Sequence, residues 1–350
     1  KEVETLELFT RSDPRDWVAH HNLALMVMRL GEFERALSSA HEALRLAPEH
    51  PFANHKVMWA YRCLGRSEEA KVIGLQALER GMDTIHLREN LALLAASEGD
   101  MTALRQHLDS QVGTVQEPRM LAFEAGFEVQ AGKMASARVL IGRAEEVALR
   151  EGLIEASARF PAYLAVAEAE IGEPDRARTT ADRALSLARS MDALPPAALA
   201  MARAGEGAIA RELVEEMTRR FPHHTLIRFV WIPAIEAALH LEEERPDEAL
   251  ATLEKARNYE RWLQVTIYLR GLAYLANGQP EEAATEMDAR LKTSWPPTIS
   301  SSNVRPSAEI RIQPEPLSCL VRRACSVSAR AACSAAVMLL WSATAVDKSF

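Results

Sequence analysis

The stretch RLGEFERAL at residues 29–37 decides the fold, because near-copies of it recur along the chain. Four close copies are CLGRSEEAK from Cys63, QAGKMASAR from Gln130, EIGEPDRAR from Glu170 and RAGEGAIAR from Arg203. Looser copies begin at Ser97, Glu242 and Ala276. A chain of 350 residues in which one short pattern recurs in this way is predicted to consist of stacked structural repeats.

The spacing of the copies gives the length of the repeat. The glycine of the pattern falls at residues 31, 65, 99, 132, 172, 205 and 278, and Glu244 takes its place once. Alanine follows five residues later at 36, 70, 137, 177, 210, 249 and 283, with Leu104 as the exception. Most steps are 33 or 34 residues, and two are 40 and 39. A period near 34 residues is typical of a repeat made of two helices.

The best-formed unit shows how one repeat folds. In WVAHHNLALMVMRL (17–30), apolar residues recur at helical spacing and no proline interrupts them, which predicts a helix. Gly31 can adopt the left-handed conformation that closes this helix. EFERALSSAHEALRLA (32–47) predicts a second helix with an apolar side, and Pro48 ends it. One such pair cannot bury its own apolar face, so neighbouring pairs are expected to stack.

Composition narrows the function. Hydrophobic residues make up 48% of the chain but aromatic residues only 6%, a balance that favours closely packed helices over strands. The net charge of −8 and the lack of a basic patch argue against nucleic acid as the partner. Three of the four cysteines crowd the C-terminus without a CxxC spacing, so neither a disulfide framework nor a zinc site is predicted.

The residues of the first full unit also carry a family resemblance. Leu23, Ala24, Gly31, Phe33, Ala36, Ala43 and Pro48 stand where the tetratricopeptide repeat family has them, and the chain resembles that family up to about residue 291. The resemblance implies an all-α, right-handed superhelix (α-solenoid) of about eight helix-turn-helix repeats over residues 17–291. The two long steps predict lengthened helices near residues 143–160 and 212–243. Residues 1–16 are similar to the second helix of a truncated upstream repeat, so we expect the chain to be a fragment.

A narrower resemblance concerns residues 12–55 and 219–241. They look like the repeat region that follows the catalytic domain in some bacterial serine/threonine protein kinases. The resemblance implies an alternative function, as the regulatory or sensor region of such a kinase, with the catalytic domain upstream of Lys1. A Gly-rich loop, an HRD motif and a DFG motif are all absent from this chain, so only an accessory role carries over.

Two short motifs come close to catalytic signatures and fail. His41-Glu42 begins like a zinc-protease HExxH, but Arg45 stands where the second histidine is needed. Gly126 and Gly132-Lys133 are one residue too far apart for a phosphate-binding loop, and Met134 replaces the serine or threonine. We therefore expect no enzyme activity, no cofactor and no metal site from this chain.

The candidate binding site comes from the family resemblance. In tetratricopeptide repeats the first helix of each unit lines an inner groove, and ligands contact its exposed stripe. That stripe maps here to the partner-binding candidates His21, Leu25, Met28, His55, Trp59, Arg62 and Leu93. Leu25, Trp59 and Leu93 replace the polar residues of a carboxylate clamp, so we predict an apolar groove for a partner helix or extended peptide, with Trp59 as an exposed anchor. The alternative is that a neighbouring unit or helices upstream cover these residues.

The last part of the chain departs from the pattern. Residues 292–350 are rich in serine, and TSWPPTISSSNVRPS (293–307) predicts disorder. The composition shift also suggests that the gene is read out of frame after about residue 290. Residues 331–346 carry no charge but are short for a membrane span. We expect a cytoplasmic scaffold that binds a protein or peptide and neither nucleic acid nor a membrane; the alternative is an extracytoplasmic region of a membrane-anchored kinase.

Overall fold

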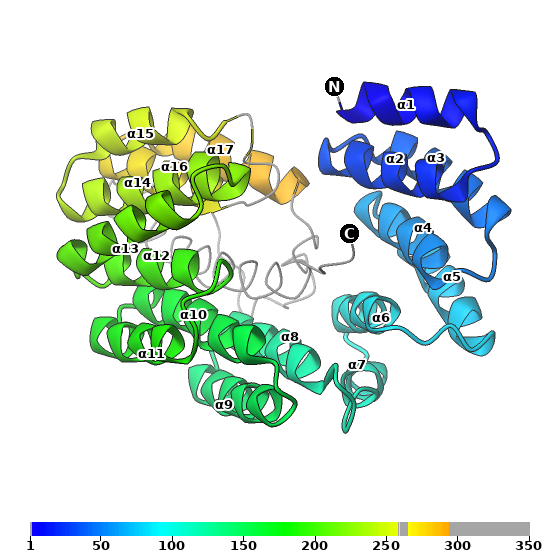
Figure 1. Cartoon of the computed structure of the whole chain (residues 1–350), viewed down its shortest axis with the longest axis horizontal. Helices are drawn as coiled ribbons and strands as arrows, with labels where there is room; N and C mark the ends of the chain where they lie inside the picture. The colour runs from blue at the N-terminus through cyan, green and yellow to red at the C-terminus, as the bar shows by residue number, and fades with distance from the viewer. Residues whose placement is uncertain (1, 258, 260–264, 294–350) are drawn as a thin grey trace, which may run out of the picture. The chain divides into compact units, whose positions relative to one another are not determined.

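The computed structural model describes residues 2–257, 259 and 265–293. Helix α1 (Glu2–Ser12) is followed by eight helix pairs, and the described residues contain no strand (Figure 1). We call the first helix of each pair the A helix and the second the B helix. The pairs are α2 (Trp17–Arg29) with α3 (Phe33–Leu46), α4 (Pro51–Cys63) with α5 (Ser67–Glu79), α6 (Ile85–Glu98) with α7 (Met101–Asp109), α8 (Glu117–Gln130) with α9 (Met134–Arg150), α10 (Ile154–Glu170) with α11 (Pro174–Leu187), α12 (Leu194–Arg203) with α13 (Gly207–Arg220), a π-helical segment (Ile227–Trp231) and α14 (Ile232–Glu242) with α15 (Pro246–Glu254), and α16 (Val265–Ala276) with α17 (Pro280–Thr293).

The repeated glycine closes each A helix, as predicted. Gly31 has a φ of 76°, and the N–H of Glu32 donates to the carbonyl of Val27 at 3.0 Å, which is the six-to-one bond of a Schellman turn. The same bond is donated at residues 66, 100, 133, 173, 206, 245 and 279. Glu244, the predicted substitute, takes the same left-handed conformation with a φ of 57°. Gly132-Lys133 is therefore a repeat turn, as the failed phosphate-loop spacing indicated.

The repeated alanine lies at the closest approach of the helices. Ala36, Ala70, Ala137, Ala177, Ala210 and Ala249 are all 0% exposed, and Ala283 is 3% exposed. Leu104, which breaks the pattern, is buried at the same position with 6% exposure. Small side chains at these points let the two helices of a pair come close together. The predicted all-α array of helix pairs is confirmed for the described residues.

The structure explains the two long spacings, of 40 and 39 residues, between successive repeat turns. The first corresponds to α9 and α10, which are each 17 residues long, as predicted for residues 143–160. At the second step α13 keeps an ordinary length of 14 residues. The extra length lies instead in the π-helical segment that precedes α14. The prediction of a lengthened helix within residues 212–243 is thus right for the A helix, where the π-helical segment extends α14, and wrong for the B helix α13.

Ion pairs connect successive repeats. In four repeats the ninth residue of the repeated pattern is a lysine or an arginine. Its side chain forms an ion pair with a glutamate next to the A-helix turn of the following helix pair. These pairs are Lys71–Glu98 at 2.6 Å, Arg178–Glu206 at 3.0 Å, Arg138–Glu173 and Arg211–Glu243. Arg105 occupies the same position and pairs with Asp109 of its own helix at 3.5 Å.

The array divides into two compact units, which the sequence did not indicate. Unit 1 holds the described residues up to Gln116, and unit 2 holds those from Glu117 to Lys292. In unit 1 the helices α1–α7 follow one another in chain order (Figure 1). The candidate groove residues all belong to unit 1, so unit 1 positions the predicted site.

The predicted tail, with its apolar segment 331–346, lies outside the described residues except for Lys292 and Thr293, which end α17. Among the residues that the structure describes, no helix has the length and apolar character needed to cross a membrane. The cytoplasmic location stays a prediction.

Candidate functional site

A row of aromatic and imidazole rings crosses the A helices of unit 1. The rings project from α2, from α4 and the residue before it, and from α6. They are Trp17, His21, His50, Phe52, His55, Trp59 and His86. We call this set the ring row. It forms because equivalent positions of successive A helices lie side by side when repeats stack.

Neighbouring rings of the row are in contact distance of one another. The ring centroids of Trp17 and His50 are 4.1 Å apart, and those of His55 and His86 are 5.0 Å apart and stacked. His55 also stacks on Trp59 at 5.9 Å. The ammonium of Lys56 lies 4.8 Å from the centroid of the Trp59 ring, a cation–π contact. Offset and edge contacts of this kind hold rings in defined orientations.

Two imidazoles of the row, those of His21 and His55, are kept uncharged. Burial, with smaller contributions from Lys56 and His50, lowers the pKa of His21 to about 3. Burial, again with Lys56 nearby, lowers the pKa of His55 well below its ordinary value. The Nδ1 atoms of His21 and His55 are both buried and accept no hydrogen bond from the described residues. A buried ring nitrogen without a donor is costly, so these two atoms could gain from a donor that a ligand supplies.

The structure corrects the predicted exposure of the groove stripe. Met28, His55, Arg62 and Leu93 are only 3–7% exposed, and Trp59 is half-buried, whereas the sequence predicted an exposed stripe. The A helices that carry the stripe each pack on several helices. Helix α2 packs on α1, α3 and α4, α4 packs on α2, α3, α5 and α6, and α6 packs on α4, α5 and α7. The uncovered stripe is therefore narrower than on a helix that packs on one side only. His21 and Leu25 remain half-buried.

Met28 and Trp59 also take part in the hydrophobic core. Met28 belongs to a buried cluster with Val27, Ala36 and Val57, and Trp59 packs against that cluster. The Trp59 ring thus takes part in helix packing and is not the exposed anchor that the sequence predicted.

Arg62 and Cys63 end α4 in a desolvated environment. Burial lowers the pKa of Arg62 to about 10, and the carboxylate of Glu89 in α6 acts in the opposite direction. Burial raises the pKa of the Cys63 thiol to about 12, so this cysteine is kept as a thiol and is a poor nucleophile.

His41 of the failed zinc-protease motif has an ordinary structural role. Its Nε2 lies 2.9 Å from the hydroxyl of Tyr61, and the two rings meet edge to face. Within the described residues no three His, Cys, Asp or Glu side chains gather as a metal site.

Unit 2 contains a polar network that the sequence analysis missed. Arg203 of α12 lies 2.9 Å from Glu170 of α10 and also pairs with Glu242 of α14, and the Tyr268 hydroxyl donates to Glu170 at 2.6 Å. Burial alone would lower the pKa of Arg203, but the Glu170 carboxylate raises that pKa above its ordinary value. Glu170, Arg203 and Glu242 each stand two residues before the repeat turn, and this alternation of charge was visible in the sequence.

Comparison with solved structures gives matches that cover most of the chain. A tetratricopeptide repeat protein from Parabacteroides merdae is 15% identical with a TM-score of 0.36, over 78% of this chain and 91% of that chain. The P58(IPK) TPR domain is 15% identical with a TM-score of 0.26, over 97% and 92%. The Cut9–Hcn1 tetramer of the APC/C gives 10% identity and a TM-score of 0.32, over 82% and 67%.

Two of these structures carry the tetratricopeptide repeats that the sequence resembles. Neither family models nor curated protein sequences give a match to this chain.

Proposed function

We propose that the chain is a protein-interaction scaffold, and that the A-helix face of unit 1 binds a partner peptide or helix. The half-buried His21, Leu25 and Trp59 make the direct contacts. The more deeply buried Met28, His55, Arg62 and Leu93 set the shape and charge of the surface beneath them. The observation that supports this proposal is the ring row together with the unpartnered Nδ1 atom of the half-buried His21.

The chemistry of the ring row indicates the kind of partner. Uncharged rings favour apolar and aromatic side chains, which would pack against their faces. The unpartnered Nδ1 atom of His21 favours a partner that also supplies an N–H or O–H donor. A short amphipathic segment with one aromatic or aliphatic anchor meets both requirements.

The test uses peptides selected from a displayed library on the purified chain. His21→Phe keeps a ring of similar size but removes the acceptor, and we expect it to weaken the selected peptides by about tenfold. Val72→Ala is the matched control, because Val72 is 50% exposed on the B helix α5. Peptides that bind His21→Phe and Trp59→Phe as tightly as the parent chain would place the binding surface elsewhere.

The kinase alternative stays a prediction from the narrower resemblance. It predicts that the sequence preceding Lys1 encodes a Gly-rich loop, an HRD motif and a DFG motif. The chain alone is expected to transfer no phosphate from ATP in the presence of magnesium. Reproducible phosphotransfer by the purified chain would contradict the prediction that it is not an enzyme.

A further inference from the structure

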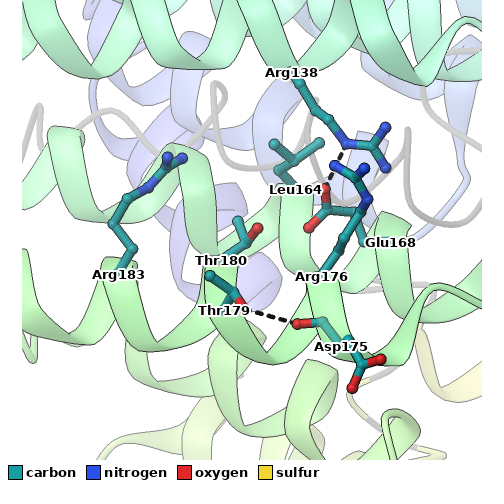
Figure 2. Close-up of a pocket in the computed structure, with 8 residues that line it drawn as sticks. All are labelled: Arg138, Leu164, Glu168, Asp175, Arg176, Thr179, Thr180 and Arg183. Carbon is teal, nitrogen blue, oxygen red and sulfur yellow. Dashed lines mark hydrogen bonds and ion pairs between the residues drawn. The ribbon is translucent and has the colours of Figure 1, made fainter.

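A polar pocket lies on unit 2 between two successive B helices. Its volume is about 430 Å³, and α9 and α11 form its walls over the A helix α10. Figure 2 shows the side chains that line it: Arg138, Leu164, Glu168, Asp175, Arg176, Thr179, Thr180 and Arg183. This surface is made by B helices, whereas the ring row of unit 1 is made by A helices.

Ion pairs between the helices frame the pocket at both ends. At one end Arg138 of α9 lies 2.7 Å from Glu168 of α10 and also pairs with Glu173 beside α11. At the other end Arg183 of α11 lies 3.3 Å from Glu145 of α9. These pairs connect α9 with α10 and α11 on either side of the pocket.

The lining contains groups whose hydrogen-bonding capacity is not used. Glu168 is 2% exposed, and its Oε2 atom is buried without a hydrogen-bond partner. The Arg176 and Arg183 side chains are 64% and 47% exposed, and each has one acidic neighbour at 3.3 Å. A guanidinium has five N–H donors, so both arginines can bind further acceptors. The pocket thus presents one buried acceptor and two cationic donor groups.

We propose that this pocket binds an extended peptide segment that carries two acidic side chains three residues apart. A peptide N–H donates to Glu168 Oε2, and the two carboxylates bind Arg176 and Arg183. In Figure 2 these arginines rise from α11 on either side of Thr179 and Thr180, and the Asp175 carboxylate points away from Arg183. The Arg176–Glu173 pair is solvent-exposed, so exchanging Glu173 for an acid of the ligand costs little. Arg183 keeps its pair with the mostly buried Glu145, and its remaining N–H groups bind the second acid.

The spacing of the acids follows from geometry. Arg176 and Arg183 are seven residues apart, which is about 10 Å along a helix. In a polyproline II conformation every third residue points the same way, and the repeat is about 9 Å. Acids three residues apart therefore meet the two arginines on one side of the peptide.

The test uses three acetylated, amidated peptides and NMR titration of the purified chain. The probe is Gly-Glu-Pro-Ala-Glu-Gly, the charge control replaces both acids by glutamine, and the spacing control is Gly-Glu-Glu-Pro-Ala-Gly. We expect the probe to bind about tenfold more tightly than the charge control and several-fold more tightly than the spacing control. Equal affinity for the probe and the charge control, or no binding of the probe, would overturn the proposal.

Variants of the chain locate the binding. Arg176→Gln and Arg183→Gln should each weaken the probe by about fivefold. Arg178→Gln is the matched control and should leave binding unchanged, because Arg178 lies on the same helix but reaches Glu206. Loss of binding in Arg178→Gln as large as in Arg176→Gln would mean non-specific charge attraction and sink the assignment.

Discussion

At the scale of single residues, the turn at Glu244 shows what the repeat requires of its backbone. Glu244 is the one non-glycine residue with a positive φ among those described. The turn still forms, because the N–H of Arg245 donates to the carbonyl of His240 at 2.8 Å, as in the glycine turns. A residue with a Cβ pays a steric penalty of about 1–2 kcal/mol in this conformation.

Glu244→Gly is expected to raise the free energy of unfolding by about 0.5–1 kcal/mol, since the strain relieved exceeds the extra freedom of the unfolded chain. Urea unfolding followed by circular dichroism measures the change. Gly205→Ala places a Cβ at the equivalent turn, where φ is 82°, and should destabilise by about 1 kcal/mol. A Glu244→Gly variant less stable than the parent would show that the glutamate side chain stabilises the turn in another way.

Trp59 is expected both to stabilise the core and to bind the partner, and the substitution Trp59→Phe can separate these two roles. Because it packs against the core cluster of Met28, Trp59→Ala should lower the free energy of unfolding by about 2 kcal/mol, less than for a fully buried tryptophan. It should also weaken partner binding by about tenfold or more, as expected for an interface anchor. Trp59→Phe retains most of the packing, so a loss of affinity without a loss of stability in that variant isolates the binding role.

At the scale of elements, buried charges connect helices that are distant in the chain. Arg203 and Glu170 have side chains that are 18% and 3% exposed, so neither charge is well solvated. Removing one partner of such a pair leaves the other charge buried and uncompensated. The exposed Arg211–Glu243 pair joins neighbouring repeats in the same unit and provides a comparison.

Arg203→Met is expected to lower the free energy of unfolding by about 3–5 kcal/mol, because Glu170 loses its counter-charge. Arg211→Met should change it by less than about 1 kcal/mol, since that guanidinium is half-exposed. Adding Glu170→Gln to Arg203→Met should restore part of the loss. Thermal melts that give similar losses for Arg203→Met and Arg211→Met would contradict the importance of burial.

At the scale of the whole molecule, the ring row makes stability depend on pH. His21 and His55 are neutral in the folded chain, whereas in the unfolded chain they accept a proton near the ordinary pKa of 6.5. Below that pH the unfolded chain binds more protons, so stability falls as the pH falls from about 6.5 toward the folded pKa of His21, about 3. Above pH 6.5 these groups contribute no pH dependence.

At about pH 5, His21 alone is expected to cost about 2 kcal/mol of stability relative to neutral pH. Urea unfolding at the two pH values measures the loss, and His21→Gln should remove this part of it. His223→Gln is the control, because His223 is exposed between α13 and the π-helical segment. An unchanged pH dependence in His21→Gln would mean that this imidazole is protonated in the folded chain.

The sequence by itself determined the helix pairs. The glycine at each turn specifies a left-handed residue, and the alanine five residues later specifies a close contact between helices. Both requirements are local, so the repeated pattern shows them directly. Even the substitute Glu244 was identifiable from its position. The candidate stripe on the A helices was placed on the correct elements for the same reason.

Only the tertiary structure decided which of those residues are covered. Met28, Arg62 and Leu93 are buried because several neighbouring helices pack on the helices that carry them. The repeat pattern does not show how much of each helix surface those neighbours cover. The pairing of Tyr268 with Glu170, 98 residues apart, likewise depends on how α10 and α16 approach in space. Local geometry is encoded residue by residue, whereas burial and long-range pairing are properties of the stack.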